Sequence, residues 1–198
     1  MNNNRFWEKK NILGLGIIAI IVILSLIKLI INPKPFDPLK LPSPMVTYEG
    51  NHVPFVLQYP ERWSLSETPK GNHGDKEVIA VINVLVPTVV ISRKTMESPN
   101  IDSAVAWGME RASRCENFLV TSQQEYETDF TTGVQLNYTC SLYISAFSQE
   151  KETCPCRDYY TISETYTYQL TFCATEAQWI EVEEVFDTMI ESFYIGDK

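Results

Sequence analysis

Apolar residues dominate the first part of the chain, where Ile12 to Ile31 form a run interrupted only by small glycines, Ser25 and Lys28. A helix of this length rises about 30 Å, which matches the hydrocarbon core of a bilayer. A cleaved signal peptide has a shorter apolar run, of roughly 7–15 residues, followed by small residues at the cleavage site. We therefore predict one uncleaved transmembrane helix over 12–31, after a short tail over 1–11.

Basic residues are unevenly placed about this predicted helix. Three precede it and two follow it: Arg5, Lys9 and Lys10, then Lys34 and Lys40. Positively charged flanks tend to remain on the cytoplasmic side of a membrane. We therefore expect a single-pass membrane protein whose N-terminus is cytoplasmic and whose C-terminal domain is extracytoplasmic.

Five prolines lie between Asn32 and Pro44, directly after the predicted membrane helix. Proline fixes φ and removes a backbone donor, so such a stretch favours an extended, stiff conformation. We predict a proline-rich spacer over 32–47 and a soluble domain over 48–198.

The soluble domain begins with short runs of β-branched and aromatic residues. Phe55–Tyr59 predicts a strand that ends at Pro60. Glu77–Leu85 and Thr88–Lys94 are two further runs separated by a Val-Pro pair, and together they predict a hairpin.

Two later segments alternate apolar and polar residues, as strands with one buried face do. They are Gly133–Phe147 and Tyr159–Cys173. We expect the two to pair as a hairpin around a loop over Ser148–Arg157.

The first of two amphipathic segments is Ile101–Cys115, in which apolar residues recur at helical spacing. Asn100 or Asp102 can cap the start of this helix, because both side chains accept hydrogen bonds from free backbone N–H groups.

The second amphipathic segment is Glu176–Phe193, which begins with the capping-box spacing of Thr175 and Gln178. One apolar stripe predicts a helix laid on a sheet. The opposite face has no Lys or Arg, and its acidic residues are Glu176, Glu181, Glu183, Glu184, Asp187 and Glu191. This face is either solvated or an acidic docking face. The expected fold class is α+β, an antiparallel sheet flanked by helices and preceded by one transmembrane helix.

The charge balance narrows the classes of partner. The chain carries 16 Lys and Arg against 25 Asp and Glu, and residues 36–198 hold 11 of the basic and 24 of the acidic groups. Phosphates would meet a field of their own sign, so we expect no nucleic-acid binding. A basic protein surface or a divalent cation fits better. Only two histidines occur, which disfavours multi-histidine metal sites, and we expect neither a resident metal nor another cofactor.

The five cysteines are Cys115, Cys140, Cys154, Cys156 and Cys173. One interpretation is one or two structural disulfides with one free thiol, as an exported domain favours. The alternative is a thiol redox or metal-binding module built on Cys154 and Cys156, although no second pair stands at metal-ligand spacing. By alternation, Cys140 belongs to the apolar face as a buried thiol. Cys173 faces the opposite side of its own strand, so we expect no disulfide between these two.

Two stretches carry a resemblance to a known family. Residues 55–63, FVLQYPERW, resemble the opening of the PsbP-like family, and the ending resembles it through residues 168–174, Trp179 and residues 186–193. The resemblance covers about residues 48–195 and implies an α/β/α sandwich around an antiparallel sheet. It also implies a protein-binding role, because the best-known members are extrinsic subunits on the lumenal face of photosystem II that help to retain inorganic ions. The matching residues are core and turn residues, so no functional site is carried over.

These observations predict a non-catalytic, membrane-anchored accessory subunit whose exported PsbP-like domain docks on a larger membrane protein complex. A photosynthetic or a respiratory complex fits equally. No nucleophile elbow, phosphate-binding loop or paired-acid motif supports an enzyme.

Overall fold

The computed structural model describes residues 43–51, 53–67, 77–82, 86–144 and 150–196. The predicted tail, the predicted membrane helix and most of the predicted spacer lie outside these residues. Among the helices of the described ranges, none is both long enough and apolar enough to span a bilayer.

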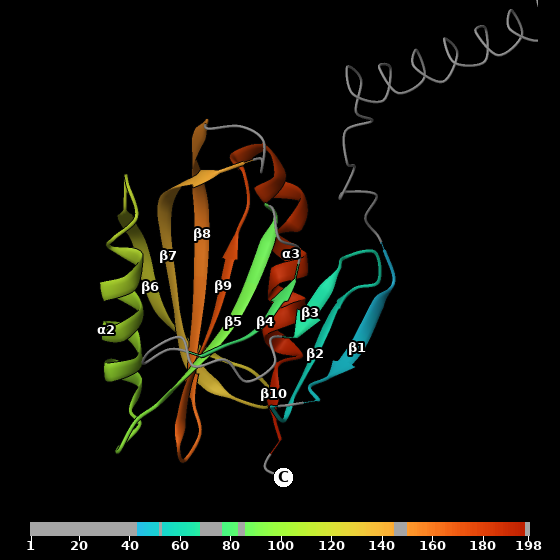
Figure 1. Ribbon diagram of the computed structural model, residues 1–198, viewed down its shortest axis with the longest axis vertical. Helices are drawn as coiled ribbons and strands as arrows, with labels where there is room; N and C mark the ends of the chain where they lie inside the picture. Colours follow the sequence, from blue (N-terminus) through green and yellow to red (C-terminus); the bar gives the residue numbers. More distant parts are fainter. Residues whose placement is uncertain (1–42, 52, 68–76, 83–85, 145–149, 197–198) are drawn as a thin grey trace, which may run out of the picture. The chain divides into compact units, whose positions relative to one another are not determined.

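The described residues form two antiparallel sheets and two helices (Figure 1). The strands are β1 (Met45–Glu49), β2 (Phe55–Pro60), β3 (Leu65–Glu67), β4 (Glu77–Ile82), β5 (Thr88–Thr95), β6 (Leu119–Glu127), β7 (Thr132–Tyr143), β8 (Lys151–Ile162), β9 (Tyr166–Cys173) and β10 (Tyr194–Ile195). The helices are α2 (Ile101–Ala112) and α3 (Glu176–Glu191).

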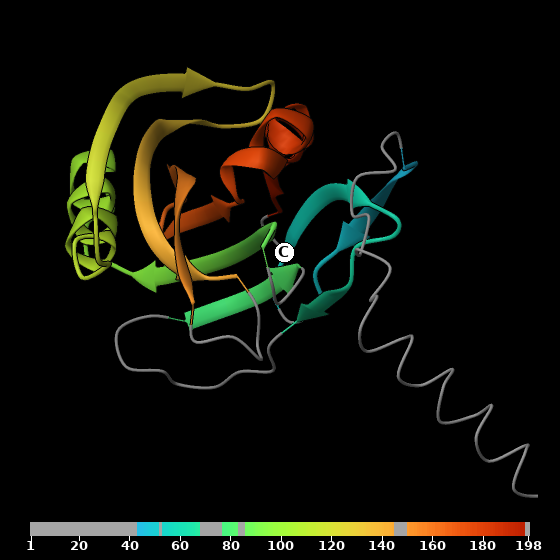
Figure 2. The same cartoon turned by 90° about the horizontal axis from the view of Figure 1, so that it is seen from above.

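The larger sheet has seven strands in the order β3-β4-β5-β9-β8-β7-β6, and the smaller has the order β1-β2-β10. Seen from above, the larger sheet curves around α3, whereas α2 lies on its outer face (Figure 2). This arrangement of helix, sheet and helix is the predicted α+β sandwich.

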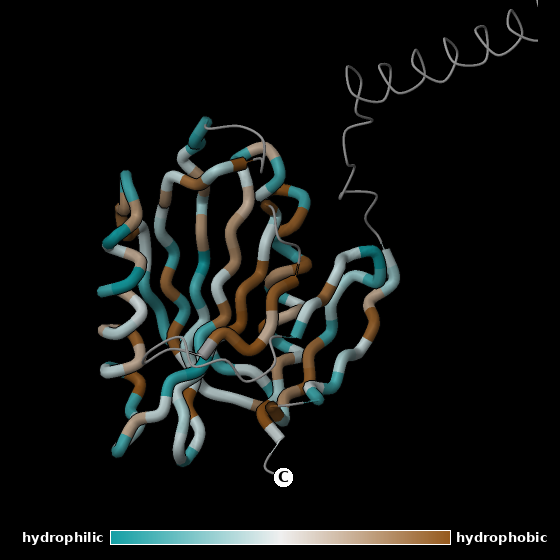
Figure 3. The backbone as a smooth tube through the Cα atoms, viewed as in Figure 1, coloured by the Kyte–Doolittle hydropathy of each residue, from teal (hydrophilic) through white to brown (hydrophobic). Residues whose placement is uncertain are grey.

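Each helix covers its own hydrophobic core. On the inner face, α3 and the smaller sheet enclose the larger core, whose biggest members include Phe55, Phe172, Phe186 and Phe193. On the outer face, α2 covers a smaller core that contains Leu136, Tyr138, Tyr160 and three of the cysteines. Hydrophobic residues concentrate on β4, β5 and β9, whereas β6 at the edge is mostly hydrophilic (Figure 3).

Both predicted helices form, and both end earlier than expected. Asn100 caps α2 by accepting a hydrogen bond from the Ser103 N–H at 2.9 Å. After Ala112 the chain tightens into a turn, in which Cys115 N–H donates to the Ala112 carbonyl, so Cys115 is not helical. In α3 the predicted capping box is confirmed, with both of its reciprocal hydrogen bonds present.

The predicted hairpin of β4 and β5 is confirmed, and a cis peptide bond precedes Pro87 between them. The single strand predicted over Tyr159–Cys173 is wrong. The chain turns after Ile162, where Ser163 N–H donates to the Tyr166 carbonyl at 2.8 Å, and it returns as β9.

The loop predicted over Ser148–Arg157 is also wrong for most of its length, because β8 already begins at Lys151 and pairs with β7. Cys154 and Cys156 therefore lie in a central strand. Four further strands were not expected, namely β1, β3, β6 and β10. The strand β1 includes Met45–Thr47, which are the last residues of the segment assigned to the spacer.

Candidate functional site

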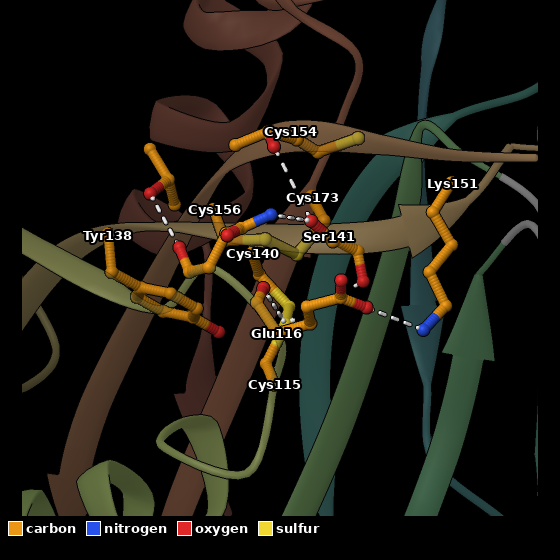
Figure 4. Close-up of a disulfide and its surroundings, with 12 residues drawn as sticks. Cys115, Glu116, Tyr138, Cys140, Ser141, Lys151, Cys154, Cys156 and Cys173 are labelled. Carbon is orange, nitrogen blue, oxygen red and sulfur yellow. Dashed lines mark hydrogen bonds and ion pairs between the residues drawn. A yellow bond between two sulfur atoms is a disulfide. The ribbon is translucent and has the colours of Figure 1, made fainter.

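The five cysteines gather on neighbouring strands and in the turn after α2 (Figure 4). Cys115 is bonded to Cys140 with a Cα–Cα distance of 5.7 Å, and Cys156 is bonded to Cys173 with a Cα–Cα distance of 4.3 Å. Cys154 is the one free thiol, and it is buried. Two disulfides and one free thiol agree with the structural interpretation of the sequence, but Cys140 is not the buried thiol that alternation suggested.

Strand register explains this pairing. Cys156 and Cys173 are directly opposite each other on β8 and β9, so their disulfide joins adjacent strands. Cys140 on β7 is directly opposite Cys154 on β8, yet it bonds to Cys115, which the turn after α2 carries to the sheet. The disulfide of Cys115 therefore fastens the α2–β6 connection to the sheet.

The structure does not bring Cys154 and Cys156 together as a dithiol, because Cys156 is already bonded to Cys173. Burial first, and the nearby charge of Glu152 second, raise the pKa of the Cys154 thiol to about 11. Within the described ranges, no cluster of His, Cys, Asp and Glu side chains is arranged to hold a metal ion.

A buried polar network lies beneath α2 and centres on Asp158, which has no exposed surface. Tyr138 and Tyr160 donate their hydroxyls to its two oxygens, at 3.2 and 2.6 Å, and Gln169 Nε2 donates at 2.7 Å. Arg111 of α2 donates to the Gln169 amide oxygen and so connects the helix to the network. These hydrogen bonds connect α2 with β7, β8 and β9.

Burial determines how this network titrates. Desolvation raises the pKa of Asp158, and hydrogen bonds from Tyr160, Thr171, Gln169 and Tyr138 oppose that rise. Desolvation also lowers the pKa of Arg111, and the charge of Asp158 is the largest opposing effect. Because Asp158 is fully buried, the network supports the fold and is not in reach of a ligand in bulk solvent.

On the inner face, a shallow cavity of about 280 Å³ opens between the β6–β8 end of the sheet and α3. Arg157 and Trp179 lie in its wall, and the Arg157 guanidinium stacks 5.2 Å from the centre of the Trp179 ring. The remaining lining is largely hydroxyl and amide groups, from residues that include Thr121, Ser122, Asn137 and Thr139.

Two of the acidic residues predicted to form one face of α3 pair with Arg157. Its side chain is 8% exposed and pairs with Glu183 at 2.6 Å and with Asp187 at 2.5 Å. These two acids are therefore turned toward the sheet and carry an ion pair. Burial raises the pKa of Asp187, and Arg157 opposes that rise.

The other acids of the predicted face, Glu176, Glu181, Glu184 and Glu191, are exposed. In the described part of the chain they form no ion pair. Ile180 lies among them and is 84% exposed. Glu191 also lines a cavity of about 580 Å³ with Glu127 and Asp129, at the far end of α3.

Sequence reasoning missed the roles of Arg157 and Ile180. The i, i+4 spacing of Glu183 and Asp187 is a signal for one shared cation, but Arg157 lies in a segment for which the sequence predicts a loop. Ile180 breaks the otherwise polar outer face of α3, and this departure from the helical pattern could have been read from the sequence.

No protein-family model and no curated protein sequence matches this chain. Solved structures do. The cyanobacterial PsbP (CyanoP) of Synechocystis is similar with a TM-score of 0.53 and 14% identity, over 77% of this chain and 92% of that chain. LpqN of Mycobacterium tuberculosis, described as involved in cell envelope biogenesis, is similar with a TM-score of 0.50 and 12% identity, over 78% of this chain and 91% of that chain. These similarities establish the fold, and they confirm the fold that the resemblance implied.

Proposed function

Because the domain has the PsbP-like fold, we propose that the chain is a non-catalytic accessory protein that docks on a larger membrane protein complex. In this proposal residues 12–31 hold the chain in a membrane by a single transmembrane helix. The N-terminus is cytoplasmic, and the PsbP-like domain works outside the cytoplasm, close to the membrane surface.

The two disulfides support an extracytoplasmic setting. Disulfides form and persist in oxidising compartments and are rare where cellular thiols keep cysteines reduced. Both bonds lie inside the packed domain, between residues that the fold places next to each other. This agrees with the orientation expected from the basic residues before the predicted membrane helix.

The exposed row on α3 is the observation that carries the docking proposal. Glu176, Ile180 and Glu184 follow one another at i, i+4 spacing, so they share one stripe of the helix. All three are exposed, and the helix beneath them is fixed to the core by five buried apolar side chains. An apolar centre with charged neighbours on a rigid helix is suited to a partner with a basic rim and an apolar pocket.

Anchoring strengthens such an interaction without further contacts. A domain tied to the membrane samples a thin layer near the surface, which raises its effective concentration at a partner in the same membrane. A weak docking surface on α3 is therefore sufficient for stable association.

The first test is the behaviour of the chain in native membranes. Membranes are dissolved in a mild detergent, complexes are separated by size, and proteins migrating with this 22.7 kDa chain are identified by mass spectrometry. We expect migration with a large assembly in fixed stoichiometry. Migration as a lone species, in membranes where other complexes stay intact, contradicts the proposal.

The second test locates the surface. The double variant Glu176→Lys with Glu184→Lys reverses two charges beside Ile180, and we expect it to lose the association. Glu125→Lys with Glu164→Lys makes the same change in net charge at two other exposed positions, and it should associate normally. Equal loss in both variants contradicts a role for α3.

A further inference from the structure

Cys154 is a free thiol that lies opposite one of the two cysteines of a disulfide. It lies directly opposite Cys140 in the register of β7 and β8, and opposite residues in an antiparallel pair have their side chains on the same face. Cys140 is bonded to Cys115, while Cys154 keeps a free thiol. Cys140 thus has two neighbouring cysteines, Cys115, to which it is bonded, and Cys154, which has a free thiol.

The backbone gives the spacing of the two strand residues. Ser141 N–H donates to the Glu116 carbonyl, so the backbone groups of Ser141 point toward the β6 side of β7. The preceding residue, Cys140, therefore turns its backbone groups toward β8 and forms a hydrogen-bonded pair with Cys154. In such a pair the Cα atoms are about 5.5 Å apart, within the roughly 4.4–6.8 Å that disulfides span.

Cys154 and Cys140 lie on the same face of the sheet, because they are directly opposite each other on β8 and β7. The Cys154 thiol donates to the Glu152 carbonyl of its own strand at 3.5 Å. The other disulfide is less accessible, because Cys156 is two residues along the same strand, about 7 Å away, and its sulfur is directed to β9. Cys140 is therefore the sulfur that Cys154 can attack.

We propose that Cys154, Cys140 and Cys115 form an internal thiol–disulfide exchange site. The Cys154 thiolate attacks the Cys140 sulfur, the Cys140–Cys154 bond forms, and the Cys115–Cys140 bond breaks. The electron pair leaves on Cys115, which takes up the proton that Cys154 released. One disulfide and one thiol are present before and after, so the step needs no oxidant or reductant.

The exchange moves a thiol from the interior to the surface region. Cys154 is fully buried, whereas Cys115 is half-buried in the turn between α2 and β6. A thiol at Cys115 is then open to reaction with small disulfides or with a thiol of another protein. After the exchange, the protein can therefore react with disulfides and with thiol-reactive electrophiles, which do not react with it before the exchange.

The turn that carries Cys115 is also held without the disulfide. Lys151 pairs with Glu116 at 2.9 Å, and Asn117 Nδ2 donates to Ser141 Oγ at 2.8 Å. Thr139 Oγ1 donates to the Asn117 carbonyl at 3.1 Å. Both disulfide isomers are therefore compatible with the same fold, which makes the exchange a local event.

Disulfide mapping of the full-length chain in mild detergent tests this proposal. Oxidised protein is held without oxygen at pH 7.5, 8.5 and 9.5, stopped with acid, treated with an alkylating reagent, and digested without reduction for mass spectrometry. We expect a Cys140–Cys154 linked peptide together with alkylated Cys115. Its initial rate should rise about tenfold per pH unit, because the thiolate is the attacking species. The original pair alone at every pH, in protein that circular dichroism shows to be folded, overturns the proposal.

Two variants make the test specific. Cys154→Ser should give neither the linked peptide nor alkylated Cys115, and alkylation of Cys115 in this variant shows that the disulfide opens by another route. Cys115→Ser leaves thiols at Cys140 and Cys154, and oxidised glutathione should join them. A folded Cys115→Ser protein that does not form this bond overturns the geometry. If Cys115→Ser does not fold, mapping of the unmodified chain decides. The outcome is independent of the docking function, which the membrane experiment tests.

Discussion

Arg157 on β8 donates a hydrogen bond to Asp187 on α3 at 2.5 Å, and this contact links the middle of the sheet to the helix that covers its inner face. The same guanidinium reaches Glu183, Asn137 and the ring of Trp179. The groups that it contacts belong to β7 and α3. Arg157 therefore holds α3 on the sheet by polar contacts, in addition to the buried apolar side chains of the helix.

Replacing this arginine should weaken the docking of α3. We expect Arg157→Ala to lower the free energy of unfolding by roughly 2–3 kcal/mol, less than for a fully buried pair because Glu183 and Asp187 are 44% and 41% exposed. Urea denaturation gives the value. Arg114→Ala is the control, since its pair with Glu110 is well exposed, and it should change stability by less than about 0.5 kcal/mol.

The close approach of α2 to the sheet at Gly108 leads to a second prediction. A Cβ at this position would lie 1.9 Å from the Tyr160 hydroxyl oxygen, whose ring is buried and whose hydroxyl is bonded to Asp158. Gly108→Ala should therefore destabilise the domain by roughly 1–3 kcal/mol despite its better helix propensity. Gly196→Ala is the matched control, because the added Cβ would lie 3.7 Å from its nearest neighbouring atom. A neutral effect of Gly108→Ala in thermal denaturation contradicts the close packing of α2.

The buried carboxyl of Asp158 gives a prediction for pH. Burial raises its pKa in the folded state above the ordinary value of an aspartate, so the folded protein holds this proton more tightly than the unfolded chain does. The resulting stabilisation is complete below the unfolded pKa and is lost as pH rises through the folded pKa. Asp158→Asn removes this dependence, and it also lowers stability at every pH, because an amide cannot accept from all of the donors around Asp158.

The measurement is the difference in free energy of unfolding between the unmodified protein and Asp158→Asn, from urea titrations between pH 4 and pH 7. The difference should grow as the pH falls. A difference that is constant or shrinks toward pH 4 is incompatible with the raised pKa.

The disulfide between β8 and β9 should be a strong constraint on the unfolded chain. Cys156 and Cys173 are 17 residues apart, and closing a loop of this size stabilises the folded state by about 3 kcal/mol in the chain-entropy model. We expect the double variant Cys156→Ser with Cys173→Ser to lose about this amount in urea denaturation. Cys154→Ser, which breaks no covalent bond, is the control and should cost about 1 kcal/mol or less.

Elements with local signals could be predicted from the sequence. Thr175 and Gln178 mark the start of α3, and Asn100 marks the start of α2, because a capping side chain and its N–H partner are three residues apart. The hairpin of β4 and β5 was recognisable for the same reason, since its two runs and its turn are neighbours in sequence.

The start of β8 was hidden by Pro155, which reads as a loop residue. In the structure Pro155 directs its carbonyl to the β9 side, where Ala174 N–H donates to it at 3.3 Å. The missing proline N–H therefore falls at the end of β9 and removes no hydrogen bond between β7 and β8. Because β8 was taken for a loop, neither the partner of Arg157 nor the position of Cys154 opposite Cys140 could be foreseen.

The edge strand β6 was missed for a different reason. Most of its residues are exposed on both faces, so its sequence, LVTSQQEYE, has no apolar alternation to detect. Only pairing with β7 defines it, and pairing depends on residues elsewhere in the chain.

The smaller sheet has a consequence for how the protein is made. Its central strand, β2, pairs on one side with β1 and on the other with β10, at the two ends of the domain. The ring of Phe55 lies 6.1 Å from that of Phe193, measured between their centres. A ribosome delivers these residues at the beginning and at the end of domain synthesis, so β2 waits for nearly the whole chain before its sheet and its core close. A nascent chain stopped before α3 therefore exposes the inner face of the large sheet.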